Sequence, residues 1–431
     1  MQRSIMQDLQ TWQNSPHRKP LILQGARQVG KTYILKEFGR QSYEQMVYLN
    51  FESQPKIHAY FSGDLNPKKI IQDLALHFGL SITPEKTLLI FDEIQECPQA
   101  LSSLKYFCEE NPEYSIAAAG SLLGVKLSPT GFPVGKVDLL NLYPMTFFEF
   151  LSAIHKQSWR DFCEKITAED AINPSLHDEL MSALRQYMVI GGMPEAVSIY
   201  QDTQDYQAVR TQQETILRTY ELDFAKHAPP NNSMKISQLW HAVPSQLAKE
   251  NKKFMFNAIR PSARAREYES SIEWLNQAGM IHQVYQISTP SIPLDAYCDK
   301  NAFKVYALDV GLLGAMSELP PRVILDPEQI FEEFKGAFTE NYVLQELIAA
   351  KHKNLYYWTS EGRAELDFII QHELKAYPLE VKAGVSKHKK SLMVYQEKFK
   401  PSQLSRATAM NLKKEDNLLN YPLYLISRFP F

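Results

Sequence analysis

Pro20–Phe38 reads PLILQGARQVGKTYILKEF, and the rest of the chain can be interpreted outward from it. Within it, Gly25–Thr32 (GARQVGKT) fits the pattern G-x-x-x-x-G-K-[ST] at every fixed position. An apolar run precedes the loop, and apolar residues follow it at helical spacing. The stretch therefore predicts a strand, a glycine-bounded loop and a helix in succession. This arrangement holds polyphosphates on backbone N–H groups and a helix N-terminus.

The loop predicts a site for ATP and Mg²⁺. The residues expected to bind ATP are Gly25, Ala26, Arg27, Gln28, Val29, Gly30, Lys31 and Thr32. Lys31 would reach the β- and γ-phosphates, and the Thr32 hydroxyl would ligate Mg²⁺. The alternative is a chance loop that holds only an anion, but the strand–loop–helix context favours the nucleotide.

Bulk composition narrows the class of protein. A chain of 431 residues with 44% hydrophobic and 22% charged residues is typical of a soluble protein with about three domains. With a net charge of −3, any nucleic-acid surface must be a local patch. The four cysteines form no C-x-x-C pair, which indicates reduced thiols in a cytoplasmic protein. We expect no secretory signal and no membrane partner, since no apolar run is long enough.

Thr87–Glu93 (TLLIFDE) is a buried strand candidate that ends in two carboxylates. Asp92 is the expected Mg²⁺ partner, and Glu93 is the expected catalytic base that polarises the attacking water. The alternative for Glu93 is that it only caps the following turn. A further strand at Tyr114–Ala119 leads into Ser121. Strands alternating with helices predict a parallel α/β sheet, with the nucleotide beyond the carboxyl ends of the strands.

The sequence resembles the bacterial and archaeal AAA-type ATPases that carry a C-terminal DUF4143 region. The stretches that carry the resemblance are GARQVGKT (25–32), FDEIQ (91–95), LYPMTFFEF (142–150), YMVIGGMPEA (187–196), the Tyr220–Asp223 spacing and FKVYALDVGLL (303–313). The resemblance implies an AAA domain over residues 1–150 that binds and hydrolyses ATP. It also implies that Ser121 contacts the γ-phosphate, although a turn-forming serine is the simpler interpretation.

Three positions depart from that family. Ala26 replaces a usual proline, Leu122 a usual serine and Lys136 a usual arginine. Lys136 offers one point charge rather than a planar fork, which leaves open an arginine finger in trans and a homo-oligomer.

The middle of the chain is expected to be helical over 151–230 and a winged helix–turn–helix over 231–300. The pattern predicts a helix from Met234 that Pro244 stops, a second helix over Ser262–Ala278 and a strand over Met280–Ile287. Lys249–Arg266 holds six basic residues against one acidic residue. The residues expected to contact DNA phosphates are Arg264, Arg266, Lys252 and Lys253. The alternatives are a solvated basic face or a surface that docks on the ATPase domain.

Residues 301–431 carry a second group of acidic residues. Glu380 and Lys382 share one strand face, and a neighbouring strand carries Asp367. Two carboxylates and a lysine on one sheet face are the parts of a metal-dependent phosphodiesterase. Asp367, Glu380 and the Val381 carbonyl would bind Mg²⁺, and Lys382 would be the catalytic residue that orients or deprotonates the attacking water.

The order helix, strand, strand with D…E-x-K resembles the PD-(D/E)xK nucleases. The resemblance adds Glu340, on the preceding helix, to the metal site. The alternative is a nuclease fold that serves only for binding or docking.

The predicted fold class is thus α/β: a parallel AAA-type sheet, a helical and winged-helix region, and a small PD-(D/E)xK-like domain. We expect an ATP hydrolase that uses Mg²⁺ and acts on DNA, and the C-terminal domain is a candidate for metal-dependent DNA cleavage. The alternative is a nucleotide-dependent conformational switch that binds a protein partner.

Overall fold

The computed structural model describes residues 1–121, 132–229, 231–248, 253–325, 332–360, 364–384 and 389–431, without the side chains of 332–334. It divides into two compact units. One comprises residues 2–143 with 277–279, and the other comprises residues 144–276 and 280–431 together with residue 1.

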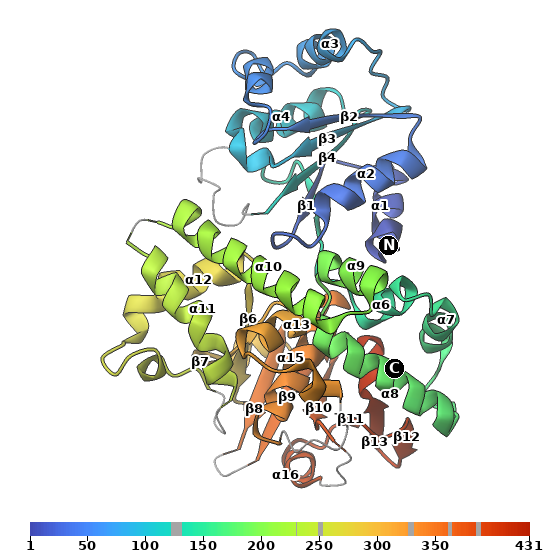
Figure 1. Cartoon of the computed structure of the whole chain (residues 1–431), viewed down its shortest axis with the longest axis vertical. Coiled ribbons are helices and arrows are strands. Elements are labelled where there is room, and N and C mark those ends of the chain that lie inside the picture. The colour runs from blue at the N-terminus through green and yellow to red at the C-terminus, as the bar shows by residue number, and fades with distance from the viewer. Residues whose placement is uncertain (122–131, 230, 249–252, 326–331, 361–363, 385–388) are drawn as a thin grey trace. The chain divides into compact units, whose positions relative to one another are not determined.

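The first unit contains a parallel sheet of five strands within the described residues, in the order β2-β3-β4-β1-β5 (Figure 1). The strands are β1 (Leu21–Gln24), β2 (Gln45–Asn50), β3 (Thr87–Asp92), β4 (Ser115–Gly120) and β5 (Asp138–Asn141). The helices are α1 (Ile5–Gln13), α2 (Lys31–Ser42), α3 (Pro67–Phe78) and α4 (Pro98–Glu110). The strands and helices predicted for this region, and the α/β class, are confirmed.

The central strands of this sheet are buried on both faces, as strands covered by helices must be. Every residue of β3 and β4 is buried, whereas the edge strands β2 and β5 alternate. β4 lies between β1 and β3, and all three run parallel. Their carboxyl ends therefore bring the loop after β1, Ser121 after β4 and Asp92 of β3 to one edge of the sheet.

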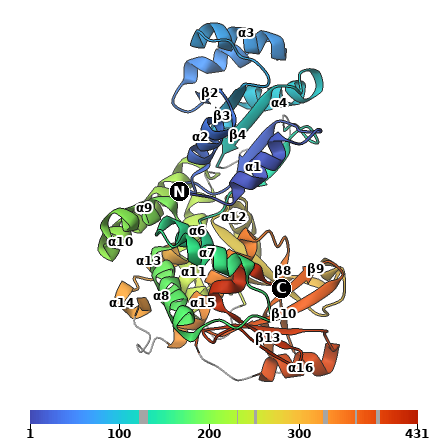
Figure 2. The same cartoon turned by 90° about the vertical axis from the view of Figure 1, so that its right-hand side faces the viewer.

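The second unit contains a mixed sheet of eight strands among the described residues, in the order β12-β13-β11-β10-β9-β8-β6-β7 (Figure 1). Figure 2 shows β8, β9, β10 and β13 of this sheet from another side. The strands are β6 (Ile281–Ile287), β7 (Cys298–Ala307), β8 (Leu355–Thr359), β9 (Glu365–His372), β10 (Lys375–Val381), β11 (Leu404–Thr408), β12 (Lys413–Glu415) and β13 (Leu418–Pro422). The helices are α6 (Phe147–Ala153), α7 (Gln157–Lys165), α8 (Pro174–Ile190), α9 (Pro194–Thr203), α10 (Tyr206–His227), α11 (Ser233–Leu247), α12 (Ala265–Gln277), α13 (Val310–Met316), α14 (Pro321–Leu325), α15 (Glu332–Ala349) and α16 (Lys390–Phe399).

The helices α15 and α16 are among those that pack against this sheet. α16 contacts β9 and β10, and α15 contacts β7 and β10. Leu366 of β9 belongs to the same apolar cluster as Leu392 and Tyr395 of α16. Because successive strand residues point to opposite faces, the neighbouring Asp367 points away from that cluster.

The predicted end of the helix at Pro244 is wrong, because α11 continues to Leu247 with the proline inside it. A proline removes one N–H bond from a helix interior, but its carbonyl can still accept. Here Ala248 N donates to the Pro244 carbonyl oxygen at 3.0 Å. Gln246 and Leu247 are buried, so packing holds the last turn. α12 also begins at Ala265, three residues after the expected start.

The sheet also bears on the expected domain boundaries. β6 pairs with β7 and with β8, so it belongs to the same sheet as the C-terminal strands. β7 runs through the boundary expected at residue 300. The four-part division of the chain stays a prediction.

A buried set of polar contacts fixes residues 145–147, which begin the second unit, to α15. Phe147 N donates to Glu346 Oε1 at 2.8 Å, and Met145 N donates to the Gly192 carbonyl at 2.6 Å. A Cβ at Gly192 would collide with the Met145 backbone, so only glycine allows this approach. Gly192 N in turn donates to Asp309 Oδ2 at 2.6 Å. Three of the stretches that carry the family resemblance thus meet in one place.

Candidate functional site

The loop between β1 and α2 has the backbone of a phosphate cradle. Gly25 and Gly30 have φ angles of 150° and 96°, and Gln28 has a φ of 63°. A Cβ at Gly25 would collide with the Leu142 carbonyl, so glycine is required there. α2 begins at Lys31, and the loop therefore runs directly into a helix N-terminus.

Lys31 bends back over this loop. Its Nζ donates to the carbonyl oxygens of Gly25 at 2.9 Å and Ala26 at 2.7 Å. Burial lowers the pKa of Lys31 to about 8, against the opposing effect of the carboxylates of Glu93 and Asp92. The ammonium group is thus held at the loop that the sequence assigns to the phosphates.

The structure brings Thr32 and Asp92 together, as predicted for a shared Mg²⁺ ion. The Thr32 hydroxyl donates to Asp92 Oδ2 at 2.9 Å, and Asp92 is buried. Two residues of β2 that the sequence reasoning missed join them. The Tyr48 hydroxyl donates a hydrogen bond to Asp92 Oδ2 at 2.7 Å, and Asn50 Nδ2 lies 3.5 Å from the same oxygen. Their position at the carboxyl end of a strand parallel to β3 was the available signal.

Glu93, the predicted base, follows Asp92 in a left-handed conformation with a φ of 50°. Gln95 Nε2 donates to its Oε2 at 2.5 Å, which fixes the carboxylate. Ser121 is buried, and its Oγ has no hydrogen-bond partner among the described residues. This buried hydroxyl lies between the loop and Asp92, and an oxygen atom of a bound ligand would supply the hydrogen-bond partner that it lacks. Lys136, at the position of the family arginine, pairs with Glu109 of α4 at 2.9 Å.

The second group of predicted residues meets on β9 and β10. The register pairs Leu379 with Phe368, which places Glu380 beside Asp367. Val381 N donates to Asp367 Oδ2 at 2.8 Å, and Lys382 Nζ lies 3.0 Å from Glu380 Oε1. The strand pairing therefore assembles the two carboxylates and the lysine as the sequence predicts.

Two residues of β7 that the sequence reasoning left without a role complete this group. The Tyr306 hydroxyl donates a hydrogen bond to Glu340 Oε2 at 3.2 Å, so the predicted metal ligand Glu340 has a partner within the protein. Lys304 forms an ion pair with Glu365 and lies 3.9 Å from Asp367 Oδ1. Burial lowers the pKa of Lys304, but these three carboxylates outweigh it, so the net effect raises the pKa. Both β7 residues belong to the FKVYALDVGLL stretch, which was the available signal.

The donor set fits a hard cation. Among the described residues, no group of three or more His, Cys, Asp and Glu side chains lies close enough to hold a metal ion. The predicted ligand Glu340 is therefore not grouped with Asp367 and Glu380, and these two carboxylates remain; oxygen donors are what Mg²⁺ takes. Glu380 is buried, and its Oε2 has no hydrogen-bond partner in the described part of the chain. A buried carboxylate oxygen is costly without a partner, which fits a cation beside Asp367.

Three family models match the chain. That of an AAA domain matches residues 17–151, and that of the domain of unknown function DUF4143 matches residues 335–425. The chain carries an AAA-type ATPase domain and a DUF4143 domain. Between them, the model of a second domain of unknown function, DUF8612, matches residues 181–323.

The individual proteins that resemble this chain share little sequence identity with it. The uncharacterized protein MJ1637 of Methanocaldococcus jannaschii is 26% identical over 196 residues, which are 41% of this chain and 38% of that relative's length. The Walker-type ATPase PABY2304 of Pyrococcus abyssi has a TM-score of 0.44 and 15% identity, over 72% of this chain and 94% of that one. The Orc1 protein of Aeropyrum pernix, in complex with DNA, has a TM-score of 0.30 and 13% identity, over 75% and 92%. Values this low carry no functional argument.

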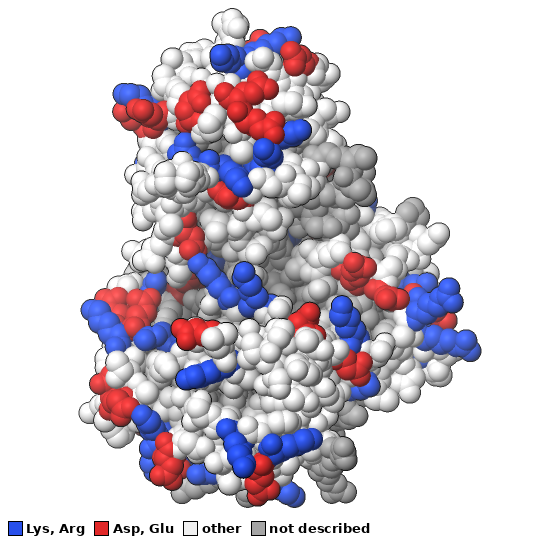
Figure 3. Space-filling model, turned by 180° about the vertical axis from the view of Figure 1, so that it is seen from behind, with Lys and Arg blue, Asp and Glu red and all other residues white. Residues whose placement is uncertain are grey.

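The residues expected to contact DNA lie around the start of α12. Arg264, just before the helix, and Arg266, inside it, are exposed, as is Lys253; Lys252 lies outside the described residues. Further along, α12 exposes Glu269 and Glu273. On the face of the molecule seen in Figure 3, basic and acidic side chains are likewise interspersed.

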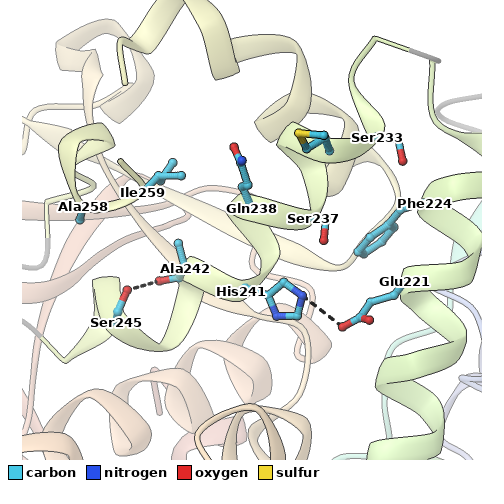
Figure 4. Close-up of a pocket in the computed structure, with 11 residues that line it drawn as sticks. Glu221, Phe224, Ser233, Ser237, Gln238, His241, Ala242, Ser245, Ala258 and Ile259 are labelled. Atoms are coloured by element: carbon cyan, nitrogen blue, oxygen red, sulfur yellow. Dashed lines mark hydrogen bonds and ion pairs between the residues drawn. The ribbon is translucent and has the colours of Figure 1, made fainter. Parts of the chain in front are cut away.

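A hollow of about 550 Å³ lies between α10 and α11, next to Ala258 and Ile259. Two of its lining residues are in contact, with Glu221 Oε1 3.3 Å from His241 Nε2 (Figure 4). Its lining comprises Glu221, Phe224, Ser233, Met234, Ser237, Gln238, His241, Ala242, Ser245, Ala258 and Ile259. Since this lining holds no Lys or Arg among the described residues, the hollow does not extend the basic positions of α12.

None of the described helices is apolar over a length that would span a bilayer.

Proposed function

We propose that the chain is a Mg²⁺-dependent ATP hydrolase that acts on DNA, with a phosphodiester-cleaving site in the DUF4143 domain. The observation that carries the proposal is the meeting of Asp367 on β9 with Glu380 on β10 and Lys382 just after β10, tied by the hydrogen bond from Val381 N to Asp367. A domain that only docks has no need for a buried carboxylate oxygen without a partner.

In the AAA domain, Gly25–Thr32 would bind the phosphates of ATP, and Lys31 would turn from the loop carbonyls to the β- and γ-phosphates. Thr32 and Asp92 would hold Mg²⁺ between them. Glu93, fixed by Gln95, would accept a proton from the attacking water. Ser121 would donate its unpartnered hydroxyl to the γ-phosphate.

In the DUF4143 domain, Asp367, Glu380 and the Val381 carbonyl would hold Mg²⁺. When bound, the ion would supply Lewis-acid stabilisation of charge on the phosphodiester. Lys382, held by Glu380, would orient the attacking water. Arg264, Arg266, Lys252 and Lys253 would contact the DNA backbone, where salt dependence measures the number of phosphates neutralised.

The second candidate function is a nucleotide-dependent switch that binds a protein partner, as a monomer or a homo-oligomer. Two observations favour it. A lysine ammonium lies among the carboxylates of the DUF4143 site. Behind Arg266, α12 exposes glutamates rather than further basic residues.

The test is cleavage of labelled single- and double-stranded DNA with Mg²⁺ or Mn²⁺, with and without ATP. We expect cleavage by the wild type, and loss of at least about 100-fold in Asp367→Ala and Lys382→Ala, because each removes a group required at the reacting phosphate. Lys375→Ala, at an exposed position of the same β10 strand, is the matched control and should cleave normally. ATP turnover without cleavage under any condition would support the switch instead.

A further inference from the structure

The β7 strand adds a charged residue to the DUF4143 site from outside the helix–strand–strand order. The side chain of Lys304 is 1% exposed, yet its ammonium reaches two carboxylates of β9. β6 and β8 lie between β7 and β9 in the sheet. Over β8, the ammonium lies 4.9 Å from the centre of the Tyr357 ring, a distance at which the ring face attracts a cation. The aromatic ring therefore lines the path by which the lysine reaches the acids.

The two carboxylates of β9 differ in what holds them. Glu365 and Asp367 share a strand face because they are two residues apart. Glu365 forms an ion pair with Lys304, whereas Asp367 Oδ1 is 3.9 Å from the same ammonium and Oδ2 accepts from Val381 N. Glu380, on the other side of Asp367, has its own cation in Lys382. Asp367 thus lies between a lysine-neutralised glutamate and the glutamate with the unpartnered Oε2.

We propose that Lys304 is a resident cation that occupies the position of a second divalent ion, between Glu365 and Asp367. The inference rests on the metal site proposed above at Asp367 and Glu380, which it limits to one ion. Pairs of carboxylates that share a divalent ion are the usual frame of two-metal phosphodiesterases. Here the ammonium group of Lys304, which is covalently part of the chain, occupies one of the two ion positions. Lys304 is accordingly a positioning residue, because it acts on Asp367 and not on the reacting phosphate.

The inference predicts a gain of metal binding when the ammonium is removed. In Lys304→Met, Glu365 and Asp367 lose their shared cation, and two neighbouring carboxylates without a cation between them repel one another. A divalent cation would relieve that repulsion. We expect the full-length variant to bind one more Mn²⁺ per chain than the wild type, counted by the loss of the free Mn²⁺ signal in electron paramagnetic resonance. Without nucleotide, any weak binding at the P-loop contributes equally to both proteins.

Two variants control the count. Lys300→Met removes an exposed lysine from the same strand and should bind as the wild type does. The double variant Lys304→Met/Glu365→Gln removes the glutamate together with its cation and should lose the additional ion. If Lys304→Met binds no additional Mn²⁺, or binds less than the wild type, the inference is wrong and Lys304 supports the site instead.

The thermal stability of the variants with and without Mn²⁺ tests whether they fold and whether the ion replaces the ammonium group. We expect the thermal midpoint of Lys304→Met to fall in EDTA and to recover with Mn²⁺ by more than the wild type gains. Lys304→Gln, which keeps a polar side chain, should behave likewise. Failure of both variants to fold with Mn²⁺ present would overturn the inference, because the ion would then not replace the ammonium. A gain of one ion by Lys304→Met over a wild type that binds none would support Lys304 as a substitute for an ion between Glu365 and Asp367, but that ion would no longer be a second one, and the Mg²⁺ site proposed at Asp367 and Glu380 would be removed.

Discussion

Residues 25–32 supply most of the proposed nucleotide site from one continuous loop, whereas the proposed DUF4143 site takes side chains from β7, β9, α15 and the end of β10, spread over residues 304–382. In the first, the glycines and the helix N-terminus fix the geometry locally. In the second, the register of β9 and β10 and the reach of Lys304 from β7 fix it. A site made from one loop can be recognised in the sequence, but a site made from a sheet depends on the order of its strands.

At the proposed nucleotide site, two single substitutions should separate ATP binding from ATP hydrolysis. Lys31→Ala should abolish measurable ATP binding, because it removes the cation that faces the phosphates, whereas Glu93→Gln should retain ATP and turn it over about 10²–10⁴-fold more slowly. Isothermal titration and phosphate release measure the two effects. The exposed Lys69→Ala and Glu110→Gln are the matched controls and should leave both unchanged. Unchanged ATP affinity in Lys31→Ala would remove the P-loop assignment, and normal turnover in Glu93→Gln would place the base elsewhere.

Sequence reasoning succeeded where neighbouring residues decide the structure. The loop, its flanking strand and helix, and the alternation of strands and helices before residue 143 could all be predicted. Asp92 could be paired with Thr32 because a known motif relates them. Tyr48 could not, since its contact with Asp92 depends on β2 lying beside β3.

In the second unit, more of the contacts depend on which strands are neighbours, so fewer of them could be predicted. Glu380 and Lys382 were placed on one face by strand periodicity alone. Lys304 and Glu365 were missed, because no local pattern shows that β7 shares a sheet with β9. Pro244 was read as a stop signal since the burial of Leu247 that extends the helix is a tertiary effect.

The assembled site also depends on how α15, which carries Glu340, is held. Glu346 of the same helix is buried and accepts from Phe147 N. Burial raises the pKa of Glu346 to about 8, so the folded chain keeps this carboxyl protonated where the unfolded chain ionises it. The stabilisation is complete below the unfolded pKa near 4.5 and is lost as pH rises toward 8.

Glu346→Gln should therefore flatten the pH dependence of stability. Between about pH 5 and pH 8, the wild type should lose up to about 1.4 kcal/mol per pH unit that the glutamine variant does not lose. Thermal midpoints at pH 5, 6.5 and 8 measure the difference. Glu397→Gln, at an exposed position of α16, should keep the wild-type slope. Parallel slopes for Glu346→Gln and the wild type would mean that Glu346 is ionised in the folded chain.

The smallest expected effect concerns the basic residues before and within α12, because this prediction rests on a local charge pattern without a buried contact. Exchanging Arg264 and Arg266 for Glu should weaken DNA binding and reduce the slope of log affinity against log salt by about 2, at roughly 0.9 for each phosphate that is no longer neutralised. Fluorescence anisotropy over a salt series measures the slope. Arg260→Glu is the matched control, because Glu267 already holds Arg260 at 2.6 Å and less of its charge is available to a phosphate. A slope that stays the same in the double variant would remove α12 as the DNA contact and leave the nuclease proposal to depend on the DUF4143 domain alone.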